Sequence, residues 1–187
     1  MLKHFEEFGE YVEITGFRDV KIEDAEAFLK ATRREQQGTA VQFFNAELVA
    51  TWEHLYFAVL NALTAFRNKT NISKSVAVEV MLYASAQRQI RKAIELVGVK
   101  RGSATVAAVI IDESPDAVKA ALSSISKRVS SEADETVLGL SKTKMHNIRR
   151  AFNISEQEVE TVVKAGDVEQ ALVGLVIERV ALLSTQL

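Results

Sequence analysis

Residues 104–111 read ATVAAVII, a nearly continuous apolar run of the length of one strand. A strand that is apolar on both sides is typical of the middle of a sheet whose two faces are covered. Several other segments of the chain have helical spacing, as described below. We therefore expect an α/β or α+β fold in which a small mixed sheet is surrounded by many helices.

Two earlier segments have the pattern of further strands. Residues 10–17, EYVEITGF, alternate apolar and polar side chains, as expected of a half-buried strand that ends near Gly16. Residues 39–44, TAVQFF, are rich in residues that favour strands, and a segment with helical spacing, 22–35, lies between the two. Asn45 is placed to cap a following helix, which we expect from about residue 47 to residue 66.

The middle of the chain predicts more helix. Residues 73–98 indicate one interrupted helix or two joined helices, with Gly98 where a left-handed C-terminal cap is expected. Ser114 and Pro115 have the order of an N-cap and a first helical position, and the helix that they begin should reach about Ile125.

The last third of the chain begins with a polar segment, 126–135, which we expect to be an exposed loop. Two short helices should follow, and then one longer apolar helix. The expected ranges are 141–151 with Ser141 as cap, 155–164 with Ser155 as cap, and from Asp167 as cap to about Ser184.

Composition limits the class of protein. At 187 residues and 48% hydrophobic, the chain is long enough for a real core, and we expect one domain over 1–187, with a strand and a helix in 1–38. The absence of cysteine excludes disulfides and thiolate chemistry and is compatible with a reducing cytosol. Neither a signal peptide nor a membrane span is expected, because the most apolar stretch, 171–183, contains Glu178 and Arg179. We therefore expect a cytoplasmic protein with no membrane contact.

Local motifs for catalysis are missing from the sequence. The three histidines, His4, His54 and His146, do not have the spacing of a two-histidine metal site, and the glycines do not form a phosphate-binding loop. We expect no catalytic residue, metal or cofactor. An enzyme whose polar residues converge from distant segments stays open as an alternative.

One helical segment, residues 84–93 (ASAQRQIRKA), concentrates cations in a chain whose formal net charge is −2. Helical periodicity predicts that Arg88, Arg91 and Lys92 point outward. The predicted core stripe on the opposite side consists of Ile90, Ala93, Ile94 and Val97. Because Glu95 follows Arg91 by four residues, a solvated and partly neutralised helix face is the alternative interpretation.

Two stretches carry a family resemblance. Residues 42–59 (QFFNAELVATWEHLYFAV) and 82–100 (LYASAQRQIRKAIELVGVK) resemble the small regulatory subunit of the KEOPS complex in its archaeal form, whose animal counterpart is the PRPK-binding protein. The matching positions are Asn45, Ala46, Val49, Ala50, His54, Ser85 to Ile90, and Gly98. The final segments, from RRAFNISEQEVE onward, are similar too, whereas Ala86 stands where the family favours glycine.

The resemblance implies a non-catalytic subunit with two partners, the atypical kinase/ATPase subunit of KEOPS and the 3′ CCA end of tRNA. Through them it would support the transferase subunit, which adds threonylcarbamoyl to the adenosine beside the anticodon of ANN-decoding tRNAs (t6A). Cations and apolar surfaces suit a single-stranded tail. Our candidates for the tRNA surface are Lys69, Lys74, Arg88, Gln89, Arg91 and Lys92. His54 is expected to be a packed or hydrogen-bonded helix residue.

The last helix is the candidate for the kinase contact, because it is apolar on more than one side. The candidate residues are Leu172, Leu175, Val176, Arg179, Val180 and Leu183. The alternative is that the sheet and neighbouring helices bury the whole helix. A purely structural subunit that binds protein but no RNA is the second alternative to the adaptor.

Overall fold

The computed structural model describes residues 1–36 and 38–185. Four strands form one sheet in the order β1-β2-β4-β3. All three pairings are antiparallel, so the expectation of a mixed sheet was wrong in this detail. Their bounds are Leu2–Phe5 for β1, Glu10–Phe17 for β2, Ala40–Asn45 for β3 and Val106–Asp112 for β4. The apolar run therefore forms a central strand, as predicted, with Val109 of β4 opposite Ile14 of β2 and Gln42 of β3. Strand β1 was not predicted.

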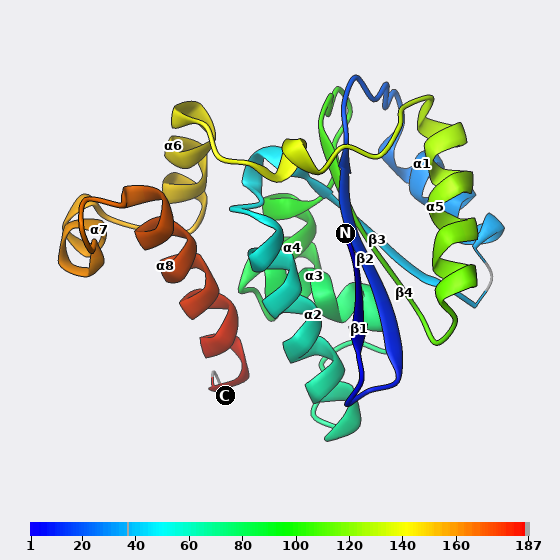
Figure 1. The fold of residues 1–187 in the computed structure, drawn as a ribbon, viewed down its shortest axis with the longest axis horizontal. Coiled ribbons are helices and arrows are strands. Elements are labelled where there is room, and N and C mark those ends of the chain that lie inside the picture. The colour runs from blue at the N-terminus through cyan, green and yellow to red at the C-terminus, as the bar shows by residue number, and fades with distance from the viewer. Residues whose placement is uncertain (37, 186–187) are drawn as a thin grey trace.

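Helices cover both faces of the sheet, which confirms the predicted fold class (Figure 1). On one face lie α1 (Ala25–Glu35) and α5 (Pro115–Val129). The other face is covered by α2 (Trp52–Arg67) and α3 (Val76–Ser85), with α4 (Ile90–Val97) beside α3. The side chains of β4 alternate between the two cores: Val106, Ala108 and Ile110 belong to the first, and Ala107, Val109 and Ile111 to the second.

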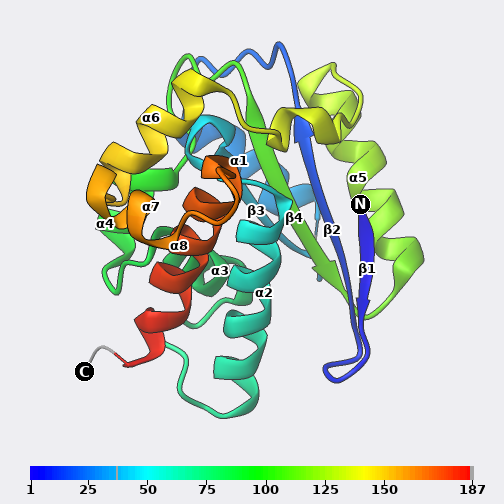
Figure 2. The same cartoon turned by 60° about the vertical axis from the view of Figure 1, so that its left-hand side comes forward.

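Three more helices form an outer layer on the α2–α3 side. They are α6 (Lys142–Ala151), α7 (Glu156–Val162) and α8 (Val168–Leu182). Figure 2 shows them in front of α2 and α3. Helix α8 packs on α2 and α3, while α7 packs on α8. The described residues also form three 3-10 turns, namely η1 (Ala46–Leu48), η2 (Glu135–Leu138) and η3 (Leu183–Thr185).

The predicted helix caps are confirmed at four positions. The side chains of Ser114, Ser141, Ser155 and Asp167 each accept a hydrogen bond from the backbone N–H three residues later. Such bonds satisfy amide groups that have no partner within the helix. At Ser155 the carboxylate of Glu158 also accepts the Ser155 backbone N–H, so α7 begins with a complete capping box.

The predicted start of the second helix was wrong. Asn45 caps the short turn η1, not an α-helix, and α2 begins only at Trp52, with Thr51 as its N-cap residue. Between them Val49 has extended backbone, and both Val49 and Ala50 are fully buried. The chain leaves helical geometry here because it has to bring these two residues into the core.

The cap predicted at Gly98 was also wrong. Gly98 has φ −69° and ψ 155°, which is extended backbone, and an added Cβ would lie 2.4 Å from the carbonyl oxygen of Ile94. Glycine is needed there for close approach, not for a left-handed conformation. The left-handed residue of this region is Ala86, with φ 51°, which ends α3. The segment 73–98 is thus two helices joined by a tight turn.

Helix α5 is longer than predicted. It continues past Ile125 to Val129, so residues 126–129 of the expected loop are helical. Ile125 and Val129 are both buried against the sheet, and they are four residues apart. The apolar stripe therefore continues for one more turn than the polar composition of 126–135 indicates.

Candidate functional site

The turn between α3 and α4 carries the cationic segment. Ala86 closes α3 by donating its N–H to the carbonyl of Tyr83, and the N–H of Gln87 bonds the carbonyl of Leu82. These two bonds satisfy the last carbonyls of α3 and reverse the chain direction. Gln89 then takes the N-cap position of α4, although its side chain makes no capping bond.

His54 fixes the position of this turn from inside the protein. Its Nδ1 accepts the Ala50 N–H at 3.1 Å, so Nε2 must carry the proton, and it donates to the carbonyl of Ala84 at 2.8 Å. The ring also meets Phe152 edge-on, with 5.6 Å between centroids. Burial lowers the pKa of His54 to about 4, so the imidazole is neutral near pH 7. This is the packed, hydrogen-bonded role expected from the sequence.

Four of the six candidate tRNA residues lie together. Arg88, Gln89, Arg91 and Lys92 are all exposed at the start of α4. The Nε of Arg91 is 2.9 Å from the Glu95 carboxylate, so part of the charge is neutralised within the helix.

Lys69 and Lys74 are exposed as well, but they precede α3. Arg88 follows that helix, whose ten residues span about 15 Å. The structure therefore places these two lysines at the opposite end of α3 from Arg88 and Gln89.

The core stripe predicted for α4 was wrong in part. Only Ala93 and Val97 are buried, whereas the side chains of Ile90 and Ile94 are 45% and 49% exposed. Helix α4 has only two turns and rests on α3 along its Ala93–Val97 edge. Its outer surface therefore combines cations with two isoleucines.

Five of the six candidate kinase residues are buried, whereas a docking surface needs exposed side chains. Leu172, Leu175, Val176, Val180 and Leu183 are all buried in this chain's own core. The sequence left this alternative open. Such a position gives their side chains a role in the fold.

Arg179 connects two helices. Its Nη2 lies 2.5 Å from Oε1 of Glu158, so it holds α8 to the start of α7. The backbone N–H of Ser155 and the guanidinium of Arg179 together lower the pKa of Glu158 to about 2.

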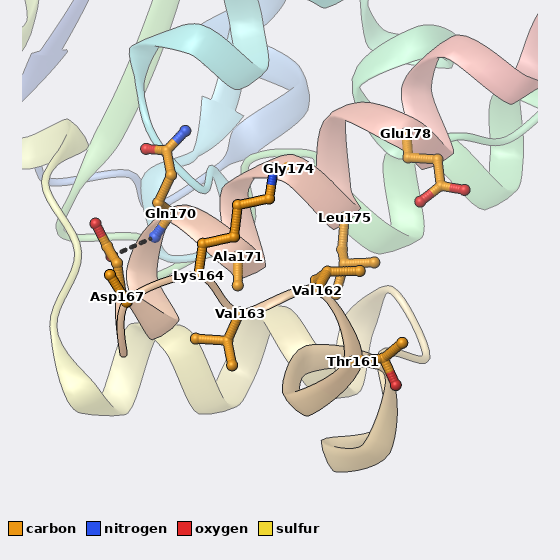
Figure 3. A pocket seen from close by; sticks show the side chains of 11 residues that line it. Thr161, Val162, Val163, Lys164, Asp167, Gln170, Ala171, Gly174, Leu175 and Glu178 are labelled. Atoms are coloured by element: carbon orange, nitrogen blue, oxygen red, sulfur yellow. Dashed lines mark hydrogen bonds between the residues drawn. The ribbon is translucent and has the colours of Figure 1, made fainter.

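An open hollow of about 760 Å³ lies between α7 and the outer face of α8 (Figure 3). Val162, Ala171 and Leu175 provide apolar surface, and Lys164, Asp167 and Glu178 lie around them. The other lining residues are Thr161, Val163, Ala165, Gln170 and Gly174. An added Cβ at Gly174 would meet no atom within 4 Å.

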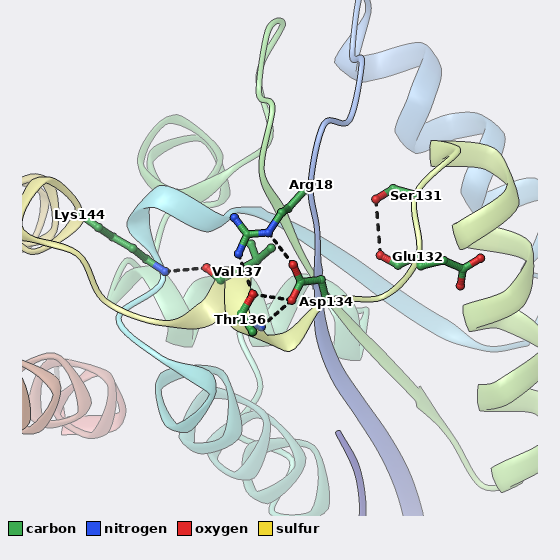
Figure 4. Close-up of polar contacts among 7 residues, drawn as sticks. All are labelled: Arg18, Ser131, Glu132, Asp134, Thr136, Val137 and Lys144. Carbon is green, nitrogen blue, oxygen red and sulfur yellow. Dashed lines mark hydrogen bonds and ion pairs between the residues drawn. The ribbon is translucent and has the colours of Figure 1, made fainter.

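A polar network fixes η2 to β2 and to α6 (Figure 4). Arg18 donates from Nε to Asp134 at 2.5 Å and from Nη2 to Thr136 at 2.6 Å. The buried Nζ of Lys144 donates to the carbonyls of Val137 at 3.1 Å and Gly139 at 3.0 Å. Burial lowers the pKa of Lys144 to about 8. The lysine therefore anchors α6 by its inner face.

Helix α6 is a second cationic surface, which the sequence analysis did not single out. Residues 142–151, KTKMHNIRRA, include four lysines and arginines and one histidine but no carboxylate. That local excess in a chain of net charge −2 is the signal that could have identified it. A hollow of about 520 Å³ lies at its C-terminal end, beside His146, Arg149 and Arg150.

Within 1–36 and 38–185, no group of three or more histidines and carboxylates is placed to hold a metal ion. In the same ranges, no helix has both the length and the apolar character that a membrane crossing needs.

Comparison with known proteins identifies relatives. A family model described as kinase binding protein CGI-121 matches residues 17–184. Regulatory protein Cgi121 from Methanocaldococcus jannaschii is 34% identical over 117 residues, which make up 63% of this chain and 72% of that protein. The family match begins at Phe17, the last residue of β2, and includes every helix described above.

Proposed function

The chain belongs to the CGI-121 family of kinase-binding proteins, and we propose that it is a non-catalytic regulatory subunit of the KEOPS complex. It binds the atypical kinase/ATPase subunit through α8 and the 3′ CCA end of tRNA through α4. By these contacts it presents ANN-decoding tRNAs to the transferase subunit for t6A formation. The family resemblance inferred from residues 42–59 and 82–100 is confirmed, and the two binding surfaces are the proposal.

The exposed surface of α4 carries the tRNA part of the proposal. Ile90 and Ile94 are about half exposed, Lys92 lies on the same two-turn helix, and Arg88 lies two residues before it. Single-stranded nucleic acid is bound by this combination, because cations contact phosphates and apolar side chains lie against unstacked bases. A solvated helix face would explain the cations but not two exposed isoleucines.

The N-terminus of α4 adds to this support. Its first turn, Ile90 to Lys92, contains no acidic residue, and the Gln89 side chain leaves the amides of that turn uncapped. Such amides and the positive end of the helix dipole favour a phosphate. Lys69 and Lys74, at the other end of α3, can contact only a more distant part of the RNA.

The experiment is a salt titration of binding between the protein and one tRNA, with the CCA tail intact or trimmed. We expect binding that needs the tail, weakens with salt and is lost in the double variant Arg88→Glu with Arg91→Glu. Arg33→Glu with Arg34→Glu is the matched control, because it makes the same charge change at two exposed arginines of α1. If the α4 variant binds tRNA as well as the native chain, the tRNA surface is elsewhere. A purely structural subunit would bind no RNA in any form.

The kinase part of the proposal rests on the outer face of α8. Most of the candidate apolar residues face inward, so the surface that a partner can reach is the hollow that Leu175 lines together with Gly174 and Glu178. A glycine inside a helix costs about 1 kcal/mol relative to alanine, and nothing in the described residues packs against this one. It allows the backbone of a partner to approach α8 closely.

Calorimetric titration with the kinase subunit tests this surface. Gly174→Arg places a long charged side chain in the hollow, and we expect at least a tenfold loss of kinase affinity with tRNA binding retained. Thr143→Arg, on the exposed face of α6, is a control for the added charge. Native kinase affinity in Gly174→Arg would exclude the outer face of α8 as the contact.

A further inference from the structure

The outer face of α6 concentrates positive charge. Residues 142, 146, 149 and 150 fall on one side of a helix with 3.6 residues per turn, while Lys144 and Ile148 point into the protein. Lys142, His146 and Arg150 are exposed, and Arg149 is half-buried. Four groups with N–H donors therefore project from one face, and the buried Lys144 fixes the helix behind them.

The charges of this face are not used inside the protein. Among the described residues, Lys142, Arg149 and Arg150 form no ion pair with a carboxylate. Arg149 makes only a 3.5 Å hydrogen bond from Nε to the carbonyl of Ile154. By contrast, Arg18 and Arg179 are each paired with an acidic side chain. One carboxylate, Glu156, also lines the hollow beside the two arginines.

The arginine end of α6 and the α3–α4 turn converge on His54. Phe152, which directly follows α6, contacts the His54 ring, and His54 bonds the carbonyl of Ala84, two residues before Ala86. Figures 1 and 2 both show α6 on the same side of the sheet as α4. The two cationic surfaces therefore belong to one side of the molecule.

We infer that the outer face of α6 binds the phosphate backbone of double-stranded RNA, namely the stem that adjoins the single-stranded tail on α4. This inference rests on the proposed tRNA function. Cations without base-reading partners contact phosphates, and an RNA duplex is recognised mainly through its backbone because its major groove is deep and narrow. The length of α6, about 15 Å for ten residues, allows contacts with more than one phosphate.

A protein partner fits this face less well. The exposed large hydrophobic side chains of the described residues lie on other elements, such as α4, α7 and α8. A protein interface needs an apolar centre, whereas contacts with RNA backbone are polar and positively charged. The composition of α6 therefore favours RNA.

The test compares two RNAs, a whole tRNA and a short single strand that ends in CCA. In Arg149→Gln with Arg150→Gln, we expect tRNA affinity to fall about tenfold and the salt dependence to decrease by about two phosphate contacts. Affinity for the short strand should not change. Arg33→Gln with Arg34→Gln is the matched control, because these adjacent arginines also occupy the last turn of a helix, on the other face of the sheet. That control should bind both RNAs like the native chain.

A second variant separates binding from folding. Because Arg149 bonds a backbone carbonyl, Lys142→Gln with Arg150→Gln changes only exposed side chains and should weaken tRNA binding in the same way. If both α6 variants bind tRNA like the native chain while the α4 variant does not, the inference is wrong and the proposed function stands. Equal weakening for both RNAs would make α6 part of the tail site and would also overturn it. If the α6 variants lose kinase binding and keep tRNA binding, α6 is a protein surface and the inference is wrong. A native chain that binds neither RNA would refute both proposals.

Discussion

The contact between β2 and η2 and the hollow between α7 and α8 are each built around a glycine, and they differ in what surrounds it. At Gly16 of β2, an added Cβ would lie 2.6 Å from Cβ of Val137 and 3.0 Å from the carbonyl oxygen of Asp134. At Gly174 of α8, it would meet nothing within 4 Å. The β2–η2 contact is closed by the chain itself, whereas the α7–α8 hollow is open.

The difference shows which of the two glycines is explained by contacts within the chain. Gly16 is required because η2 lies directly on β2, where Arg18 and Lys144 hold it. Gly174 weakens its helix without any packing contact in return among the described residues. An internal explanation is therefore available for Gly16 and not for Gly174, which is why we assign the open hollow to a partner.

The largest effect on stability is expected on the inner side of α8, which packs on the core, and not on its outer side, which faces the hollow. Leu172→Ala should lower the free energy of unfolding by about 2 to 5 kcal/mol, because Leu172 of α8 is fully buried in the main core. Glu178→Ala, on the open side, should change it by less than about 0.5 kcal/mol. Urea unfolding measures both variants. Equal effects would break the distinction between the two sides.

Acid should destabilise the fold through His54, a buried residue of α2. The pKa of His54 is about 4 in the folded protein and 6.5 as its ordinary value, so between these pH values the unfolded chain binds the extra proton. Stability should therefore fall as the pH drops from 6.5 to 4, by roughly 3 kcal/mol. Urea unfolding at several pH values measures this, and in His54→Gln the loss over the same window should be smaller. A loss of the same size in the variant would assign the acid sensitivity to other groups.

Gly16→Ala tests the closed contact directly. Because a strand backbone and the Val137 Cβ cannot move apart freely, we expect a loss of about 1 to 3 kcal/mol in unfolding free energy. Thermal or urea unfolding measures it. A variant as stable as the native chain would show that η2 does not depend on the missing side chain.

Gly174→Ala should have a small effect of the opposite sign. Alanine fits the open space and favours helix, so the unfolding free energy should rise by about 0.5 to 1 kcal/mol. The same unfolding experiment measures this. Destabilisation would mean that the chain itself fills the hollow.

Local signals predicted much of the fold. The apolar run 104–111 identified the central strand, and the side chains of Ser114, Ser155 and Asp167 marked helix starts, because a capping bond involves residues three positions apart. Strand β1 escaped prediction because its four residues are defined by pairing with β2, not by a pattern of their own.

The candidate surfaces were predicted less well because they depend on which neighbour covers a helix. In α4, α3 covers the Ala93–Val97 edge and leaves Ile90 and Ile94 exposed, a choice that periodicity does not make. In α8, apolar residues occur all round, so the sequence could not tell the inward stripe from the outward one. The cationic face of α6 was predictable from composition, since its exposed charges follow one another at helical spacing.

The strand order also delays assembly of the sheet during synthesis. Strand β2 and strand β3 both pair with β4 and not with each other, and Ile14 has to wait for Val109. At ribosomal rates, about 5 to 20 s pass between the emergence of these two residues. During that interval the apolar edges of the β1–β2 hairpin and of β3 have no partner in the nascent chain. Fragments that end before residue 106 should therefore form no complete sheet and should depend on chaperones to stay unaggregated.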